Sequence, residues 1–288
     1  MISERKLESV ETPTPHQGFL GAGHIARALI RNDFEKTDPF IILMDDRIVV
    51  PPGDPVGAPH PHAGLETVSL ILDGKLGEGS HAVEAGDFEL MTAGSGVIHT
   101  ESMEPGTKLR VLQMWLTLPQ KDRWAPPRLQ RLHLDSVPKH VADGQEIRVY
   151  SGSFAGVTSP VQNYVPLTVA DIWLQPGALT RQTLPGSHTS FLYVIKGSLE
   201  VGEEGRSLSE DQMGWLAKTT EDSGAALLLK GGPEGARVVL YSAPPQHESI
   251  ASYGPFIGNR QRDIIRLYDE YHQGKMKHIS TVEDVVDF

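Results

Sequence analysis

The sequence predicts an all-β fold made of two similar β-barrel domains, followed by a short C-terminal helix. Glycine (29 residues) and proline (21 residues) are frequent, and they separate short runs rich in Val, Ile, Leu and Thr. This pattern is typical of strands joined by turns. In addition, the segment ETVSLILDGKL in the first half is similar to TSFLYVIKGSLEV in the second half. Internal duplication of a β-barrel is the simplest explanation of this similarity.

The strands of both halves are expected between glycine and proline residues, and each repeat is expected to contain a tight glycine turn between two strands. The expected strands of the first half are Phe40–Met44, Glu66–Leu72, Asp87–Thr92 and Leu109–Leu118. Those of the second half are Leu167–Leu174, Ser190–Ile195, Ser198–Val201, Ala225–Leu229 and Val238–Ser242, with a turn at Gln175–Ala178.

The domain boundary is expected in a proline-rich linker, Pro119–Gly144. Residues 1–140 would then form an N-terminal metal-binding domain with its linker. Residues 141–288 would form a metal-free second domain that carries the C-terminal helix. The expected helix has a candidate cap at Asn259, a candidate end at Gly274, and Ile264, Tyr268 and Tyr271 on one face.

Composition excludes several classes of function. The net charge of −11 argues against binding to nucleic acid or to an anionic membrane, because both favour clustered Lys and Arg. The absence of cysteine excludes disulfides, thiolate metal sites and cysteine nucleophiles. The N-terminal residues contain no apolar stretch typical of a signal peptide, and no membrane-spanning apolar run occurs. We therefore expect a cytoplasmic protein.

Two pairs of side chains have the spacing of metal ligands. His60 and His62 lie two residues apart, and His99 and Glu101 repeat this spacing about forty residues later. Alternate side chains of an extended strand share a face, so each pair would point in one direction. Two neighbouring strands could therefore bring three imidazoles and a carboxylate to one divalent transition metal, with positions left open for a substrate or oxygen.

Spacing alone leaves the carboxylate ligand undecided. Glu66 has the same parity as His60 and His62, so on an unbroken strand it would face the same side. A twist or bulge near Gly64 could turn it away. Both Glu66 and Glu101 therefore remain candidates at this point.

Longer stretches of the chain resemble the pirin family, which belongs to the cupin superfamily. The matching segments of the first half are DPFIILMDD (38–46), HPHAGLETVSLILDG (60–74), GDFELMTAGSGVIHTE (86–101) and LQMWLTLP (112–119). The second half is similar more loosely, through TSFLYVIKGSLEVG and GPFIGN (254–259). Together these segments extend over most of the chain.

The resemblance implies a bicupin with one metal ion in its N-terminal barrel. It also implies the ligand set His60, His62, His99 and Glu101, and so favours Glu101 over Glu66. Fe(II) is the metal usually associated with the family, and Mn, Ni, Co, Cu or Zn are alternatives. The second barrel has only His188 where the first has its histidine pair, so we expect that barrel to be metal-free.

The family also implies two kinds of function. One is a quercetin 2,3-dioxygenase, which cleaves a flavonol with O2; Glu101 would then accept the flavonol proton. The other is a metal- or redox-dependent binding protein that contacts a transcription factor or a metabolic enzyme. Ala63 and Ser95 replace arginines that are frequent in the family motifs, which predicts a less positive entrance to the site.

Two further patterns are set aside. Gly21–Ala26 fits the dinucleotide fingerprint G-x-G-x-x-A, but the polar, proline-containing residues before it do not form the buried strand that this site requires. The other histidines, His24 among them, lack paired spacing, and we interpret most of them as surface or capping residues.

Overall fold

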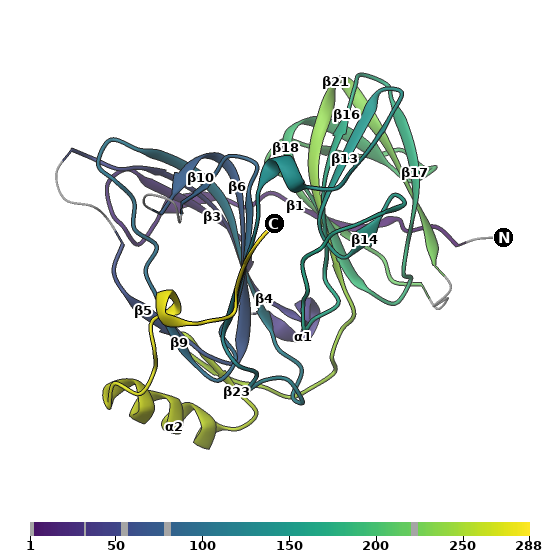
Figure 1. Cartoon of the computed structure of the whole chain (residues 1–288). Helices are drawn as coiled ribbons and strands as arrows, with labels where there is room; N and C mark the ends of the chain where they lie inside the picture. The colour runs from purple at the N-terminus through teal and green to yellow at the C-terminus, as the bar shows by residue number, and fades with distance from the viewer. Residues whose placement is uncertain (1–2, 32, 53–56, 78–81, 220–223) are drawn as a thin grey trace. The chain divides into compact units, whose positions relative to one another are not determined.

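The chain forms two compact units, each built mainly of β-strands (Figure 1). The computed structural model describes residues 3–31, 33–52, 57–77, 82–219 and 224–288. Unit 1 comprises residues 1–13 and 137–245, and unit 2 comprises residues 14–136 and 246–288. The fold class expected from the sequence, an all-β chain with a short C-terminal helix, is confirmed.

The division between the units differs from the one expected at residues 140 and 141. The central crossing, at Val137, lies close to it, but the two terminal segments are exchanged. The first thirteen residues join unit 1 because β1 (Leu7–Glu11) pairs with β20 (Met213–Leu216). The last forty-three residues, with the helix, join unit 2. Such long-range pairings leave no local signal in the sequence.

Unit 2 is built on a nine-stranded sheet. Its strand order is β2-β3-β4-β10-β6-β8-β11-β24, with β7 paired to β6. The strands are β2 (Pro15–Gln17), β3 (His24–Arg31), β4 (Phe40–Val49), β6 (Leu65–Leu76), β7 (Val83–Glu84), β8 (Phe88–Thr92), β10 (Lys108–Thr117), β11 (Arg128–Leu132) and β24 (Val285–Asp287). Shorter elements are α1 (Phe34–Thr37), the pair β5 (His60–His62) and β9 (Val97–His99), η2 (Leu134–Ser136), the pair β22 (Ala251–Tyr253) and β23 (Phe256–Gly258), α2 (Gln261–His272) and η3 (Ile279–Thr281).

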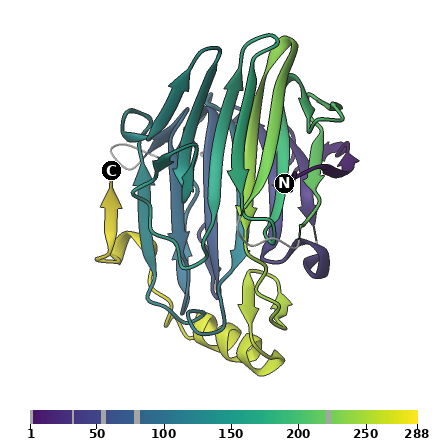
Figure 2. The ribbon, with the colours of Figure 1, turned by 90° about the vertical axis from the view of Figure 1, so that its right-hand side faces the viewer.

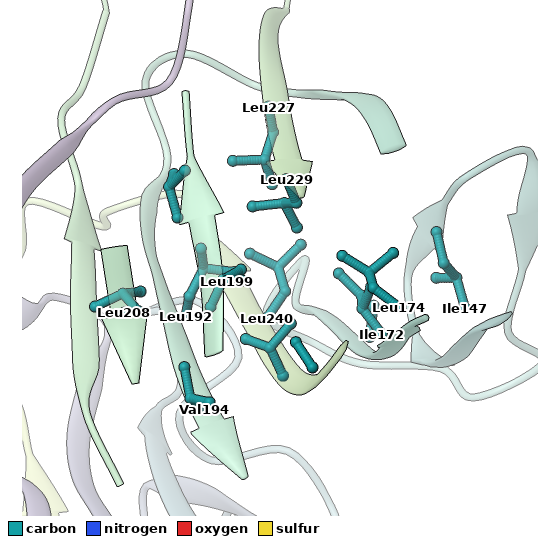
Figure 3. Packing of buried hydrophobic residues seen from close by; sticks show 14 of the residues in the cluster. Ile147, Ile172, Leu174, Leu192, Val194, Leu199, Leu208, Leu227, Leu229 and Leu240 are labelled. Atoms are coloured by element: carbon teal, nitrogen blue, oxygen red, sulfur yellow. The ribbon is translucent and has the colours of Figure 1, made fainter. Parts of the chain in front are cut away.

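Unit 1 also contains a nine-stranded sheet, of order β1-β20-β18-β21-β16-β13-β12, with β17 paired to β21 and β19 to β18. The strands of this sheet not yet defined are β12 (Lys139–Ala142), β13 (Gln145–Ser151), β16 (Thr168–Leu174), β17 (Leu179–Leu184), β18 (Thr189–Val201), β19 (Arg206–Ser209) and β21 (Ala225–Ala243). A separate two-stranded sheet is formed by β14 (Ser153–Phe154) and β15 (Val157–Thr158). Alternate residues of these strands point inward and form a leucine-rich core, in which Leu192, Leu227 and Leu240 are fully buried (Figure 3).

The expected glycine turn inside each repeat is wrong. Each repeat instead forms one long strand, β6 or β18, whose register shifts by a bulge near Gly74 or Gly197. At Gly74 the backbone has φ of +80°, and a Cβ atom would lie 1.7 Å from the carbonyl oxygen of Lys108. Glycine is required here because the strand bends against its neighbour without leaving the sheet.

The expected linker contains regular structure as well. Strand β11 pairs with β8, and β12 pairs with β13. Proline residues at 119, 126, 127 and 138 lie outside these strands, so the segment is proline-rich between its strands but does not act as a free connection. Strand β3 also lies where the dinucleotide fingerprint would require a helix.

The C-terminal helix α2 packs on unit 2 beside β23, and in Figure 2 the chain continues from it to the yellow strand β24. Its N-cap is Arg260 rather than Asn259, because Arg260 has an extended backbone just before the first helical residue. The Asp263 carboxylate accepts hydrogen bonds from the backbone N–H groups of both residues. Ile264 and Leu267 are buried. Within the described residues, no helix has the length and apolar character needed to span a membrane.

Candidate metal centre

Three histidines meet where two short strands pair at one end of unit 2. In the antiparallel pair β5–β9, His60 lies directly opposite His99, and Pro61 lies opposite Ile98. His62 follows on the same strand as His60, with the alternation expected of extended chain. The local pattern His-Pro-His and the distant His99 are therefore joined by strand pairing.

The three imidazoles are close enough to share one ion. One nitrogen atom from each of His60, His62 and His99 lies within 4.8 Å of the others. The Nε2 atoms of His60 and His99 are 2.8 Å apart. Among the residues that the structure describes, this is the one group of three or more His, Asp or Glu side chains with such geometry.

The chemistry of this donor set fits a divalent transition metal. Burial, with a smaller contribution from the neighbouring His60, lowers the pKa of His62 to about 3. Burial, followed by His62, holds the pKa of His99 well below its usual range. Both rings are therefore neutral near pH 7, and a neutral imidazole is the form that binds metal.

A backbone carbonyl fixes the orientation of the third ring. His60 Nδ1 lies 2.9 Å from the carbonyl oxygen of Ala58, to which it can only donate. The Nε2 atom of His60 is then left with its lone pair directed toward His99. A hydrogen bond from the second ring nitrogen to a carbonyl oxygen is the usual arrangement around metal-binding histidines.

Glu101 lies next to the three histidines but outside their closest contacts. Its Oε2 atom is 4.0 Å from His60 Nε2, and about 30% of its side chain is exposed. Burial raises the pKa of Glu101 to about 7, with smaller contributions from the charges of Glu89 and Asp46. Its carboxylate can reach a metal held by the histidines or a proton on a ligand beside them.

The backbone turns at Gly64, so the Glu66 side chain does not point in the same direction as the side chains of His60 and His62. Gly64 has φ of +76°, and a Cβ atom here would lie 1.9 Å from the carbonyl oxygen of Ile257. Strand β5 ends at His62 and β6 begins at Leu65. The parity argument that kept Glu66 as a candidate fails because the chain is not one continuous strand.

Glu66 lies on the opposite face of the sheet from the cluster. It is paired with Leu116, whereas the neighbouring Trp115 packs its ring 4.8 Å from His62. Adjacent residues of a strand point to opposite faces. Thr92 Oγ1 donates a 2.9 Å hydrogen bond to Glu66 Oε1, and Glu66 is fully buried. Glu101 is therefore the carboxylate beside the histidines.

The cluster opens into a cavity of about 1080 Å³ inside unit 2. His60, His62 and Glu101 line it, and most of the remaining wall is apolar, with Ile42 and Val111 among its residues. A large apolar cavity with a few polar groups is typical of a small-molecule site.

Several residues near the cavity were not identified from the sequence. His24 is 2% exposed and lies 2.8 Å from Asp46, so it is an exception to the surface or capping role expected for most of the unpaired histidines. The Ser69 hydroxyl donates to Gln113 Oε1 at 2.8 Å, and Gln113 lines the cavity. None of these residues has a sequence spacing that would reveal it, because each contact joins different strands.

The C-terminal segment contacts the stretch of chain that carries His99 and Glu101. His278 Nε2 and Thr100 Oγ1 are 3.1 Å apart, and Thr100 lies between His99 and Glu101. The Ile98 N–H also donates to the carbonyl oxygen of Lys277 at 2.9 Å. The last forty residues of the chain therefore contribute to the position of two candidate ligands.

The two substitutions expected to change the charge at the entrance lie elsewhere. Ala63 is fully buried against Phe256 and Ile264. Ser95 lies in a turn, where its N–H donates to the Ala125 carbonyl oxygen. Neither residue lines the cavity of this chain, and the less positive entrance stays a prediction.

The chain matches two family descriptions, "Pirin" over residues 24–116 and "Pirin C-terminal cupin domain" over residues 169–277. It is 32% identical to Pirin-like protein 2 of Arabidopsis thaliana, over 87% of this chain and 79% of that protein. It is 31% identical to a Pseudomonas aeruginosa protein provisionally named quercetin 2,3-dioxygenase, over 94% of this chain and 98% of that protein. A crystal structure of quercetin 2,3-dioxygenase from Acinetobacter baumannii superimposes with a TM-score of 0.82 at 24% identity, covering 96% of this chain and 100% of that chain.

Proposed function

Because the chain belongs to the pirin family and is a bicupin, we propose that it is a mononuclear iron dioxygenase that cleaves a flavonol such as quercetin. The observation that carries this proposal is the convergence of three imidazoles and one carboxylate at the wall of a large, mainly apolar cavity. The provisional name of the relative from Pseudomonas aeruginosa supports the same reaction.

In this proposal His60, His62 and His99 hold the metal, and Glu101 is its carboxylate ligand. The metal would supply the Lewis-acid and redox chemistry that a reaction with dioxygen requires. Three histidines and a carboxylate leave coordination positions for the reactants.

The chain's own side chains would orient the substrate and move its proton. The apolar wall around Ile42, Val111 and Trp115 fits a flat aromatic molecule and excludes water. Glu101, whose Oε2 lies 4.0 Å from His60 Nε2, would accept the proton of the flavonol hydroxyl that enters beside the histidines.

The test combines metal content with oxygen uptake in the presence of quercetin. The parent protein, loaded with Fe(II), is compared with His62→Ala and with His140→Ala as a matched control, because His140 belongs to unit 1 and lies outside the cavity. We expect nearly one metal per chain and oxygen uptake in the parent and the control. Both should be lost in His62→Ala.

Two results would change the conclusion. Metal binding without oxygen uptake would reject the flavonol dioxygenase and favour a metal-dependent binding protein. Failure of the parent protein to bind any divalent metal, even after loading, would reject the metal centre itself.

A further inference from the structure

A second polar site lies on the wall of the same cavity and has no part in the metal cluster. His24 on β3 and Asp46 on β4 both line the cavity, and His24 Nε2 is 2.8 Å from Asp46 Oδ1. The side chain of His24 is 1% exposed and that of Asp46 is 12% exposed. A carboxylate buried in a mainly apolar wall is costly unless hydrogen bonds compensate for its lost hydration.

The surroundings of His24 fix which way its hydrogen bonds run. The N–H of Leu20 points to His24 Nδ1 at 3.4 Å, so Nδ1 is an acceptor and Nε2 carries the proton donated to Asp46. Gly18 packs directly on the ring, since a Cβ atom there would lie 2.2 Å from Nδ1. Phe19 contacts the ring edge-to-face at 5.3 Å. His24 is therefore held in one orientation.

This arrangement leaves one oxygen of Asp46 for a molecule in the cavity. Oδ1 accepts from His24, and no described residue donates to Oδ2. Along β10, Asp46 pairs with Val111, four residues from the Trp115 ring that contacts His62. Val111 and Trp115 are therefore about 13 Å apart along the strand. Asp46, beside Val111, and His62, beside Trp115, would contact different parts of one bound molecule.

We propose that Asp46, oriented by His24, is a specificity-determining residue that accepts a hydrogen bond from a second hydroxyl of an aromatic substrate. The inference rests on the proposed function, in which the first hydroxyl enters beside the histidines. It predicts a preference for polyhydroxylated flavonols over those with a single hydroxyl. A hydrogen bond to a charged acceptor contributes about ten-fold or more to affinity.

The test measures binding rather than turnover. Protein loaded with Zn(II), which cannot support redox chemistry, is titrated with quercetin and with 3-hydroxyflavone, which has one hydroxyl, and tryptophan fluorescence gives each Kd. In Asp46→Asn, the Kd for quercetin should rise at least about ten-fold, and that for 3-hydroxyflavone less than about two-fold. Asp135→Asn is the matched control, because it makes the same chemical change at an exposed carboxylate of unit 2 outside the cavity, and it should alter neither Kd.

His24→Gln tests the positioning role of the histidine. It should weaken the preference for quercetin while leaving the Kd of 3-hydroxyflavone and the zinc content unchanged. A general structural defect would instead weaken binding of both ligands equally.

The outcomes separate this inference from the proposed function. Equal changes for both ligands in Asp46→Asn, no change for quercetin, or no flavonol binding by the parent would each overturn it. A preference that depends on Asp46, without oxygen uptake by the iron-loaded parent, would support the inference and reject the dioxygenase. Oxygen uptake without that preference would support the dioxygenase and reject the inference.

Discussion

Arg123 links the C-terminal segment of unit 2 to the loop that follows β10 through hydrogen bonds, and its removal should weaken metal binding. The side chain is fully buried. Its Nε and Nη2 atoms donate to the Leu118 carbonyl oxygen at 3.1 and 2.6 Å, and Nη1 donates to the Gly258 carbonyl oxygen at 3.1 Å. Glu248 completes the set, with Oε2 3.3 Å from Nη2. Arg123→Met removes all of these bonds and keeps a long apolar side chain.

The magnitude follows from what the substitution leaves behind. Two carbonyl oxygens lose a charged donor, while the carboxylate of Glu248, about 28% exposed, can regain water. A buried polar group that loses its partner costs about 1–3 kcal/mol, so the two carbonyl oxygens together should lower the free energy of unfolding by about 2–6 kcal/mol. For a unit of this size that corresponds to a decrease in Tm of roughly 6–17 °C. Gly258 ends β23, whose Ile257 donates to the carbonyl oxygen of Ala63 beside the histidines.

The assay combines denaturant unfolding with hydrogen exchange of β23 and with chelator competition for bound metal. Lys121→Met is the matched control, because its side chain is 82% exposed and should alter the free energy of unfolding by less than about 0.5 kcal/mol. We expect faster exchange in β23 and weaker metal binding in Arg123→Met. A loss below about 1 kcal/mol, with unchanged exchange, would refute the reasoning and show that apolar contacts alone hold the segment.

Three further predictions concern the site and the core. His278→Ala removes the hydrogen-bond partner of Thr100, so metal affinity should fall about ten-fold in chelator competition. An unchanged affinity would show that His278 does not help to position His99 and Glu101. In metal-stripped protein, burial raises the pKa of Glu101 to about 7, above its unfolded value near 4.5, so the ionised carboxylate destabilises the fold as pH rises through 7. Glu101→Gln should therefore raise the Tm of that protein at pH 8 more than at pH 5, and an equal shift at both would argue against it. Leu240→Ala should cost about 2–5 kcal/mol by creating a cavity in unit 1, measured by denaturant unfolding, while metal content stays unchanged.

The candidate ligands could be predicted from the sequence because their pairing is local. His60 and His62 share a face through the simple alternation of a strand, and the same spacing separates His99 from Glu101. The position of Glu66 could not be predicted in this way. It depends on the backbone at Gly64, where close contact with Ile257 interrupts the strand. Assignment of His60, His62, His99 and Glu101 as ligands stays a prediction until a metal is measured.

Spacing, composition and family resemblance indicated the all-β class, the duplicated plan and the two pairs of candidate ligands. The spacing patterns could do so because strand periodicity acts over a few residues. Tertiary structure decided what depends on pairing between distant segments. The N-terminal segment belongs to unit 1 and the C-terminal segment to unit 2, opposite to the expected division. Strands β6 and β18 run on past Gly74 and Gly197, and His24 lies against Asp46. Those outcomes follow from registers between strands far apart in the chain, and no local pattern of residue types specifies such a register.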